Sequence, residues 1–209
     1  MKITFKALVY AIVFTCFCSV AKAQIIIPDS VRIGVGLNVA STTGNSFGVA
    51  VNKAIGDEAK SAYNFGAGVS LNVDIPAYLL SNLYVTASAG YMSFLKSGNA
   101  SKSAQAIEGI KTPNFNMIPV KLGLKYIIGN RFYVNAEAGE SFLANKQQLY
   151  AIFNNAFTWS PSIGLVMPFT NHHHQYIDAN LRYESTKTFY NDNNLNNYWS
   201  LRVTYAFNL

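Results

Sequence analysis

Residues 197–209 read NYWSLRVTYAFNL, and their side chains alternate between apolar and polar up to the last residue. Successive side chains of a β-strand point to opposite faces, so a period of two gives this segment one apolar face and one polar face. The fold depends on which of these two faces meets protein and which meets another medium. The apolar face holds Trp199, Leu201, Val203, Tyr205, Phe207 and Leu209, and the polar face holds Ser200, Arg202, Thr204, Ala206 and Asn208.

The same alternation recurs along the chain in about eight segments of roughly 9–13 residues each, with no convincing helical period. In the second segment, for example, Tyr63 and Phe65 begin the apolar face and Asn64 lies on the polar face. The pattern therefore predicts an all-β fold. The predicted strands are 31–40, 63–75, 83–95, 117–128, 132–139, 157–167, 176–184 and the segment that ends at residue 209.

The connections between these segments alternate between short and long. They are short after the second, fourth and sixth strands (76–82, 129–130 and about 169–175). They are long and polar after the first, third, fifth and seventh strands (about 43–60, 96–113, 145–156 and 185–196). Up-and-down strands collect all long loops at one end, which is the arrangement of outer-membrane barrels.

The composition of the polar face indicates the surroundings of the barrel. A lipocalin-like barrel would keep its apolar face inside around a ligand, whereas a barrel in a membrane turns that face to lipid. Here the polar face is also small, with repeated glycines such as Gly34, Gly66 and Gly123, which suits the crowded interior of a narrow barrel. An Arg or Lys side chain facing lipid at mid-bilayer costs about 2–4 kcal/mol. We therefore expect a closed antiparallel transmembrane β-barrel with its charges inside.

The charges on this face are nearly balanced, so they could pair with one another in the lumen. We expect a rigidifying polar network there, with a narrow anion pathway as the alternative, because an eight-stranded lumen is just wide enough for side chains to fill it. The predicted network comprises Arg32, Asp74, Lys121, Lys125, Glu137, Asp178, Arg182, Glu184 and Arg202.

Aromatic residues fall near both ends of the predicted strands. Trp159 and Trp199 lie at the ends next to long loops, and Tyr126, Phe132 and Phe207 lie at the ends next to short turns. Two such belts are expected at the two interfaces of a membrane. The alternative is that aromatic residues simply favour strands.

The N-terminus predicts a secretory signal peptide over residues 1–23, followed by one barrel domain over residues 24–209. Lys2 and Lys6 precede an apolar run that ends in the small-residue triplet Ala21-Lys22-Ala23. The signal holds both cysteines and three of the 16 basic residues but no acidic residue, so 13 basic residues face 10 acidic ones after cleavage. A net charge of about +3 does not support nucleic-acid binding. Charged residues make up only 12% of the chain although hydrophobic residues make up 50%.

Together these features resemble the porin-like outer-membrane β-barrel family of Gram-negative bacteria, in particular its small OmpA/OmpX-type eight-stranded members. The resemblance rests on the signal peptide, the strand count, the segment IPVKLGLKY at 118–126 and the aromatic C-terminal strand. It implies location in the outer membrane, contact with outer-membrane lipid, and recognition of the C-terminal strand by the assembly machinery. The chain ends in Leu209, with Phe207 two residues earlier, where an aromatic terminal residue is usual in the family.

No catalytic residue, metal site or cofactor is predicted. His172, His173 and His174 fall in a predicted short periplasmic turn, and metal binding there is the minor alternative. Some small outer-membrane barrels are enzymes, but these histidines lie at the wrong end for an outward-facing active site. We expect a non-catalytic structural or surface-interaction protein whose long extracellular loops contact an unknown surface ligand. A narrow porin for small solutes and a secreted lipocalin-like binder remain as alternatives.

Overall fold

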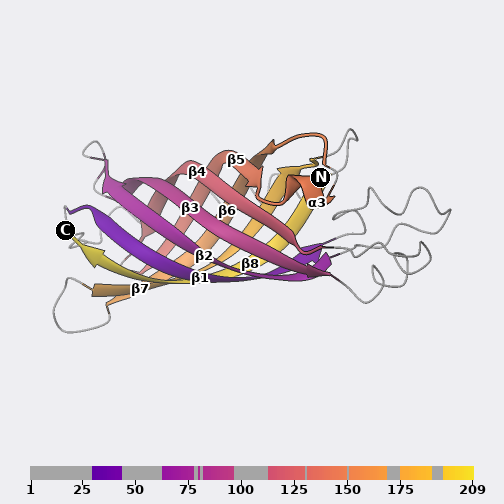
Figure 1. Ribbon diagram of the computed structural model, residues 1–209. Helices are drawn as coiled ribbons and strands as arrows, with labels where there is room; N and C mark the ends of the chain where they lie inside the picture. Colours follow the sequence, from indigo (N-terminus) through magenta and orange to yellow (C-terminus); the bar gives the residue numbers. More distant parts are fainter. Residues whose placement is uncertain are drawn as a thin grey trace, which may run out of the picture.

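The computed structural model describes residues 30–43, 63–77, 80, 82–96, 113–129, 131–149, 151–168, 175–189 and 195–209. Eight antiparallel strands form one closed barrel in sequence order, and β8 pairs with β1 to close it (Figure 1). This confirms the predicted up-and-down barrel. The strands are β1 (Arg32–Thr43), β2 (Tyr63–Pro76), β3 (Leu83–Lys96), β4 (Phe115–Ile128), β5 (Phe132–Leu143), β6 (Asn155–Pro168), β7 (Gln175–Lys187) and β8 (Leu195–Asn208).

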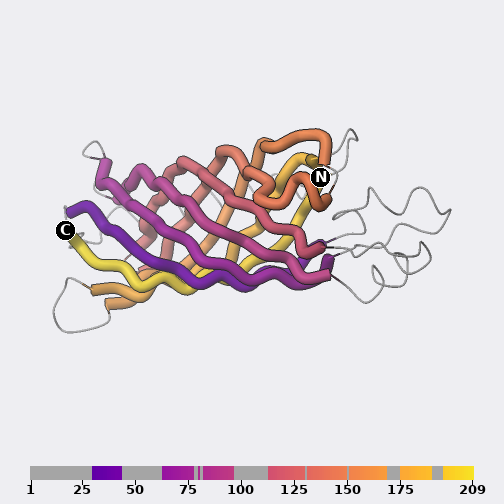
Figure 2. Tube along the Cα trace, viewed as in Figure 1, coloured from indigo at the N-terminus to yellow at the C-terminus, as the bar shows by residue number. Residues whose placement is uncertain are grey.

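The two ends of the barrel differ in their connections. Helix α3 (Lys146–Leu149) follows β5 at the end that we call the loop end, and Gly129 turns the chain from β4 to β5 at the opposite, turn end. Gly129 has φ of 65°, a left-handed conformation that glycine adopts without steric cost. The strands run obliquely between the two ends (Figure 2).

The side chains alternate in burial as the sequence pattern predicts. Leu37 and Leu122 on the outer surface are 68% and 65% exposed, whereas Lys121 and Arg202 are 3% and 5% exposed inside the barrel. Leu201 also faces outward. The apolar face of the C-terminal strand is thus on the outside, which is the inverse of the burial that a lipocalin-like binder requires.

The strands exceed several predicted boundaries, and β5 differs most. It continues past the predicted end at residue 139 to Leu143, because Ser141 and Leu143 still pair with Pro119 and Met117 of β4. The long connection after it was predicted as a loop, yet it includes the single turn of α3. The Asn145 side chain anchors this turn, since its Nδ2 donates to the Asn114 carbonyl at 2.6 Å and its Oδ1 accepts from the Asn116 amide at 3.1 Å.

The prediction that Tyr63 shares the outer face with Phe65 is wrong. The register of β2 and β3 shifts between these residues, from Tyr63↔Lys96 to Phe65↔Leu95, so Asn64 is an extra residue in a β-bulge. Phe65 stays outside at 49% exposed, while Tyr63 turns inward at 2% exposed. The Tyr63 hydroxyl donates to the Pro113 carbonyl at 3.0 Å, which fixes it beneath the loop end.

The interior of the barrel is layered. Apolar side chains fill both ends of the lumen, and charged side chains fill the middle. The loop-end cluster contains Ala40, Tyr63, Met92, Phe94, Phe115, Met117, Leu143, Leu149, Ala151, Ala156, Phe189 and Tyr198. The turn-end cluster contains Tyr84, Ile127, Tyr133, Val166, Tyr176 and Ala206.

Candidate functional site in the barrel lumen

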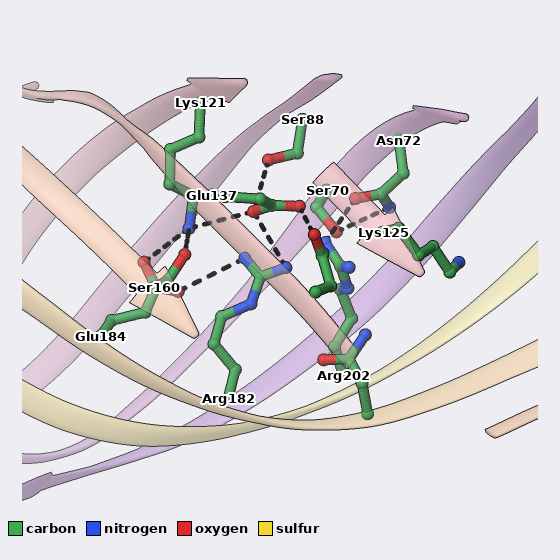
Figure 3. A network of polar contacts seen from close by, with 12 residues as sticks. Ser70, Asn72, Ser88, Lys121, Lys125, Glu137, Ser160, Arg182, Glu184 and Arg202 are labelled. Carbon is green, nitrogen blue, oxygen red and sulfur yellow. Dashed lines mark hydrogen bonds and ion pairs between the residues drawn. The ribbon is translucent and has the colours of Figure 1, made fainter. Parts of the chain in front are cut away.

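The first charged group of the lumen, which we call the Lys121 cluster, joins residues from β4, β5 and β7. The Lys121 Nζ lies 2.6 Å from Glu184 Oε2 and 3.7 Å from Glu137 Oε2. Arg182 completes the group, with Nη2 at 3.1 Å from Glu137 Oε2 and Nη1 at 3.7 Å from Glu184 Oε1 (Figure 3). All four side chains are at most 6% exposed. Two cations and two carboxylates therefore neutralise one another away from solvent.

Glu137 is the most fully bonded member of this cluster. Besides its two cationic partners, it accepts from Ser88 Oγ at 3.1 Å and from Asn135 Nδ2 at 3.1 Å. Lys121 likewise donates to Ser160 Oγ at 3.2 Å. A buried carboxylate is stable only when its oxygens are paired and hydrogen-bonded, and Glu137 meets both conditions.

Glycines lie directly opposite two of these charged residues on the facing strands. Lys121 pairs across the ladder with Gly139, and Glu137 pairs with Gly123. A Cβ atom at Gly139 would lie 2.8 Å from Lys121 Cα, and one at Gly123 would lie 2.8 Å from Glu137 Cγ. A Cβ atom at either glycine would also overlap a backbone carbonyl oxygen of the facing strand, so these two glycines let β4 and β5 approach closely beside Lys121 and Glu137.

The second charged group, the Lys125 cluster, lies nearer the turn end. The Lys125 Nζ lies 2.6 Å from Asp178 Oδ2 and 2.8 Å from Asp74 Oδ2. It also lies 4.2 Å from the centroid of the Tyr133 ring, whose hydroxyl donates to Asp178 Oδ1. One lysine therefore connects carboxylates of β2 and β7 across the lumen and packs against an aromatic face.

Arg202 and Arg32 take neutral partners instead of forming the carboxylate pairs that the balance of charges suggested. Arg202 donates to Asn72 Oδ1. When the Asn180 side-chain amide is oriented with its oxygen towards Arg202, this oxygen accepts from Arg202 Nε at 3.0 Å and from Nη2 at 3.1 Å. The Arg32 guanidinium lies over the rings of Tyr84 and Tyr176, 5.0 and 4.7 Å from their centroids. The nine predicted residues thus lie in the lumen as two ionic clusters and two separately held arginines.

The aromatic residues of the loop-end cluster were missed as a functional feature. Phe94, Phe115, Phe189 and Tyr198 are all 0% exposed. Ring centroids lie 4.9 Å apart for Phe94 and Tyr198, and 5.6 Å apart for Phe115 and Phe189. A signal was present for three of them, since each occupies a position of the inward face. Phe189 follows β7 outside any periodic segment, so the pattern offered nothing to find it.

The predicted interfacial aromatics are on the outer surface. Trp159 and Trp199 are 46% and 47% exposed towards the loop end, and Tyr183 lies between them with ring centroids at 6.2 and 5.2 Å. Tyr183 was not among the predicted aromatic residues, although it contacts both tryptophans. At the turn end Phe132 and Phe207 face outward, while Tyr126 is half-buried.

Among the described residues, two small cavities lie between the charged side chains. One cavity of about 20 Å³ lies among Arg32, Thr86, Lys125 and Arg202, and another of about 20 Å³ lies among Ser88, Lys121 and Arg182. Each holds about one water molecule. Within the described residues, no three His, Cys, Asp or Glu side chains group as metal ligands, and no helix is long and apolar enough to cross a membrane. His172, His173 and His174 lie outside the described residues.

Comparison with known proteins gives this barrel its family. The model of the "Outer membrane protein beta-barrel domain" family matches residues 10–207. The chain belongs to this family. It is accordingly an outer-membrane β-barrel protein, and its apolar outer surface faces lipid.

Solved structures of similar fold include bacterial surface proteins. Ail of Yersinia pestis is 14% identical, with 87% of this chain and 100% of that chain covered and a TM-score of 0.46. Neisserial surface protein A is 9% identical, with 86% and 97% covered and a TM-score of 0.48. OprG of Pseudomonas aeruginosa is 11% identical, with 86% and 96% covered and a TM-score of 0.45. No curated protein matches the chain.

Proposed function

We propose that this protein is a non-conducting, non-catalytic scaffold that holds its long loops at the cell surface for contact with a surface partner. The observation that carries this proposal is the filling of the lumen in three layers. A barrel of eight strands has a lumen that side chains can fill, so its rigidity depends on how completely they do so. Rigid elements position binding loops, which is the use we infer for this barrel.

The charged layer supports a closed lumen. Lys121 and Lys125 each contact a carboxylate at 2.6 Å and a second carboxylate at 3.7 or 2.8 Å. A permeating ion would have to replace these contacts, and separating buried, paired charges costs several kcal/mol. The rings of the loop-end cluster add a dry layer above it, which an ion could enter only by losing its hydration shell.

The same pairing argues against catalysis in the lumen. Among the lumen carboxylates that the structure describes, Glu137 and Glu184 are nearest the loop end, and both are held by Lys121 and Arg182. A general base must reach a substrate proton with a free oxygen lone pair. Carboxylates that are closed in beneath a layer of aromatic rings do not offer one.

Conductance in planar lipid bilayers tests the proposal. The wild-type barrel should give no reproducible open steps, and Phe94→Ala with Phe115→Ala should also stay closed, because the charged layer still fills the middle of the lumen. The matched control is Phe65→Ala with Phe142→Ala, which removes two outward rings that are 49% and 37% exposed. Open steps from the wild type would instead establish the narrow porin.

The location of the loops can be tested with single cysteines, because both natural cysteines fall in the predicted signal. We expect the protein isolated from outer membranes to begin at Gln24, by mass measurement. On intact cells, a membrane-impermeant maleimide should label Ser101→Cys and leave Ala77→Cys unlabelled. The opposite labelling would place the long loops in the periplasm and remove the surface-scaffold function.

Two partners belong to the same proposal. The barrel contacts outer-membrane lipid through its apolar belt, and its C-terminal strand is read by the outer-membrane assembly machinery. Phe207→Ser should reduce the amount of assembled barrel in cells, while refolding of the purified variant into detergent should change little. An equal defect in both settings would assign Phe207 to folding stability alone.

A further inference from the structure

The outer surface of the barrel has an apolar groove that the lumen function does not use. Its volume is about 520 Å³, and it crosses the outer faces of β4, β5, β6, β7 and β8. Four steps between neighbouring strands, at about 4.8 Å each, give it a length of about 19 Å. The groove therefore extends across five neighbouring strands of the lipid-facing belt.

Small side chains create the hollow. Ala136 of β5 and Pro161 of β6 are direct ladder partners and line the groove together. Larger residues stand on both sides of them, including Leu124 of β4 and Ile163 of β6, which are 55% and 60% exposed. The result is a depression bounded by side chains that project from the surrounding belt.

One end of the groove has an aromatic wall. Tyr183 and Trp199 both line it, with ring centroids 5.2 Å apart. Tyr183 also contacts Trp159, with ring centroids 6.2 Å apart, so the wall is part of a row of three rings in edge-on and tilted contact. Such a wall offers a fixed surface, because each ring is restrained by the next.

The floor of the groove also lies over an interruption in a β-ladder. The pairing of β6 and β7 stops after Trp159↔Ser185 and resumes at Ser162↔Arg182. Continuing this register places Pro161 opposite Tyr183. Proline has no amide hydrogen, so it cannot donate to the facing strand as any other residue would. An apolar cover over this seam keeps water from competing for the remaining backbone contacts.

We propose that the groove is a binding site for one acyl chain of a membrane lipid, held more firmly than the lipids that surround the rest of the barrel. The groove is continuous with the lipid-facing belt, so bilayer chains are the apolar groups that reach it from every side. Its lining is almost entirely apolar, and its length lies within the roughly 30 Å of a hydrocarbon core. A chain seated there fills a void that a straight neighbouring chain would leave.

Lipid retention tests this proposal. The whole barrel is reconstituted in phosphatidylcholine, extracted into detergent and weighed intact by native mass spectrometry. Wild type should keep one phosphatidylcholine molecule. Ala136→Phe fills the groove and should lose it, whereas Ala67→Phe adds the same ring to the outer face of β2 and should keep it. All three proteins are first shown to be folded by heat-modifiable gel mobility.

A second measurement uses Trp199 as a reporter from within the site. Trp159→Phe leaves Trp199 as the single tryptophan, because the chain has two. In bilayers with a small fraction of phosphatidylcholine brominated on its acyl chains, Trp199 should be quenched several-fold more than bulk mixing predicts, and Ala136→Phe should abolish the excess. Quenching equal to bulk mixing, equal lipid loss from both phenylalanine variants, or a protein dimer seated on this face would overturn the proposal.

Discussion

Replacing Lys121 with methionine should remove the central cation of the Lys121 cluster while keeping the unbranched side chain up to the ε position. Lys121 Nζ lies 2.6 Å from Glu184 Oε2, a separation that corresponds to an attraction of about 6 kcal/mol at an effective dielectric constant of about 20. Desolvation of both groups offsets part of this attraction in the intact protein. The variant, however, leaves two carboxylates beside Arg182 alone, so we expect it to lose about 3–5 kcal/mol of unfolding free energy.

A double-mutant cycle separates this electrostatic loss from a packing defect. Glu184→Gln removes one of the two carboxylates, so Lys121→Met should cost less in that background, with a coupling energy of about 1–3 kcal/mol. Leu122→Met is the control, since Leu122 is the next residue and is 65% exposed on the outer face. Unfolding by urea in lipid vesicles, followed by tryptophan fluorescence, measures the four proteins of the cycle and the Leu122→Met control. A loss below about 1 kcal/mol for Lys121→Met, with no coupling, would refute the reasoning.

Three further outcomes follow from the same barrel. Leu201→Arg should strongly reduce the heat-modifiable band on refolding, because a lipid-facing Arg near mid-bilayer costs about 2–4 kcal/mol, while Arg202→Leu should reduce it less; equal effects would contradict the assigned faces. Gly139→Ala should destabilise the barrel in urea, since the added Cβ would overlap the Val120 carbonyl oxygen and lie 2.8 Å from Lys121 Cα. An unchanged midpoint would show that the strands can move apart. In Gly129→Ala the added Cβ has no atom within 4 Å, but the alanine must adopt a positive φ, so the unfolding free energy should fall by about 1–2 kcal/mol. A larger fall in unfolding free energy would point to an unrecognised contact.

The period of two was sufficient to predict the barrel and the face of almost every strand residue. Lys121 and Leu122 are neighbours in the sequence with opposite surroundings, and alternation alone distinguishes them. Register against lipid is strongly specified, because a slip of one residue would turn every charge outward. The face of Tyr63 was predicted wrongly, because the β-bulge adds one residue without changing the alternation of polar and apolar residues in the sequence.

The partners inside the lumen could not be predicted in the same way. Alternation gives the face of a residue but not its height in the barrel, and height depends on the stagger between strands. Lys121 pairs with Glu184 and Lys125 pairs with Asp178, although alternation alone allowed several inward carboxylates as the partner of each lysine. Arg202 donates to amide oxygens and not to a carboxylate, because Asn72 and Asn180 lie at the same height in the barrel as the Arg202 guanidinium.

Closure of the barrel by its first and last strands also sets the order of its folding. The pairs run from Arg32↔Asn208 to Thr43↔Asn197, so the last residues of the chain pair with the first described strand. Contacts at such sequence separation form slowly, because loop-closure entropy must be overcome before they stabilise anything. Until β8 arrives, β1 is an open edge that could pair with any other exposed strand. The chain therefore commits to its final topology only when its C-terminal residues are in place, and its vulnerability to misassembly is concentrated in the interval before that last step.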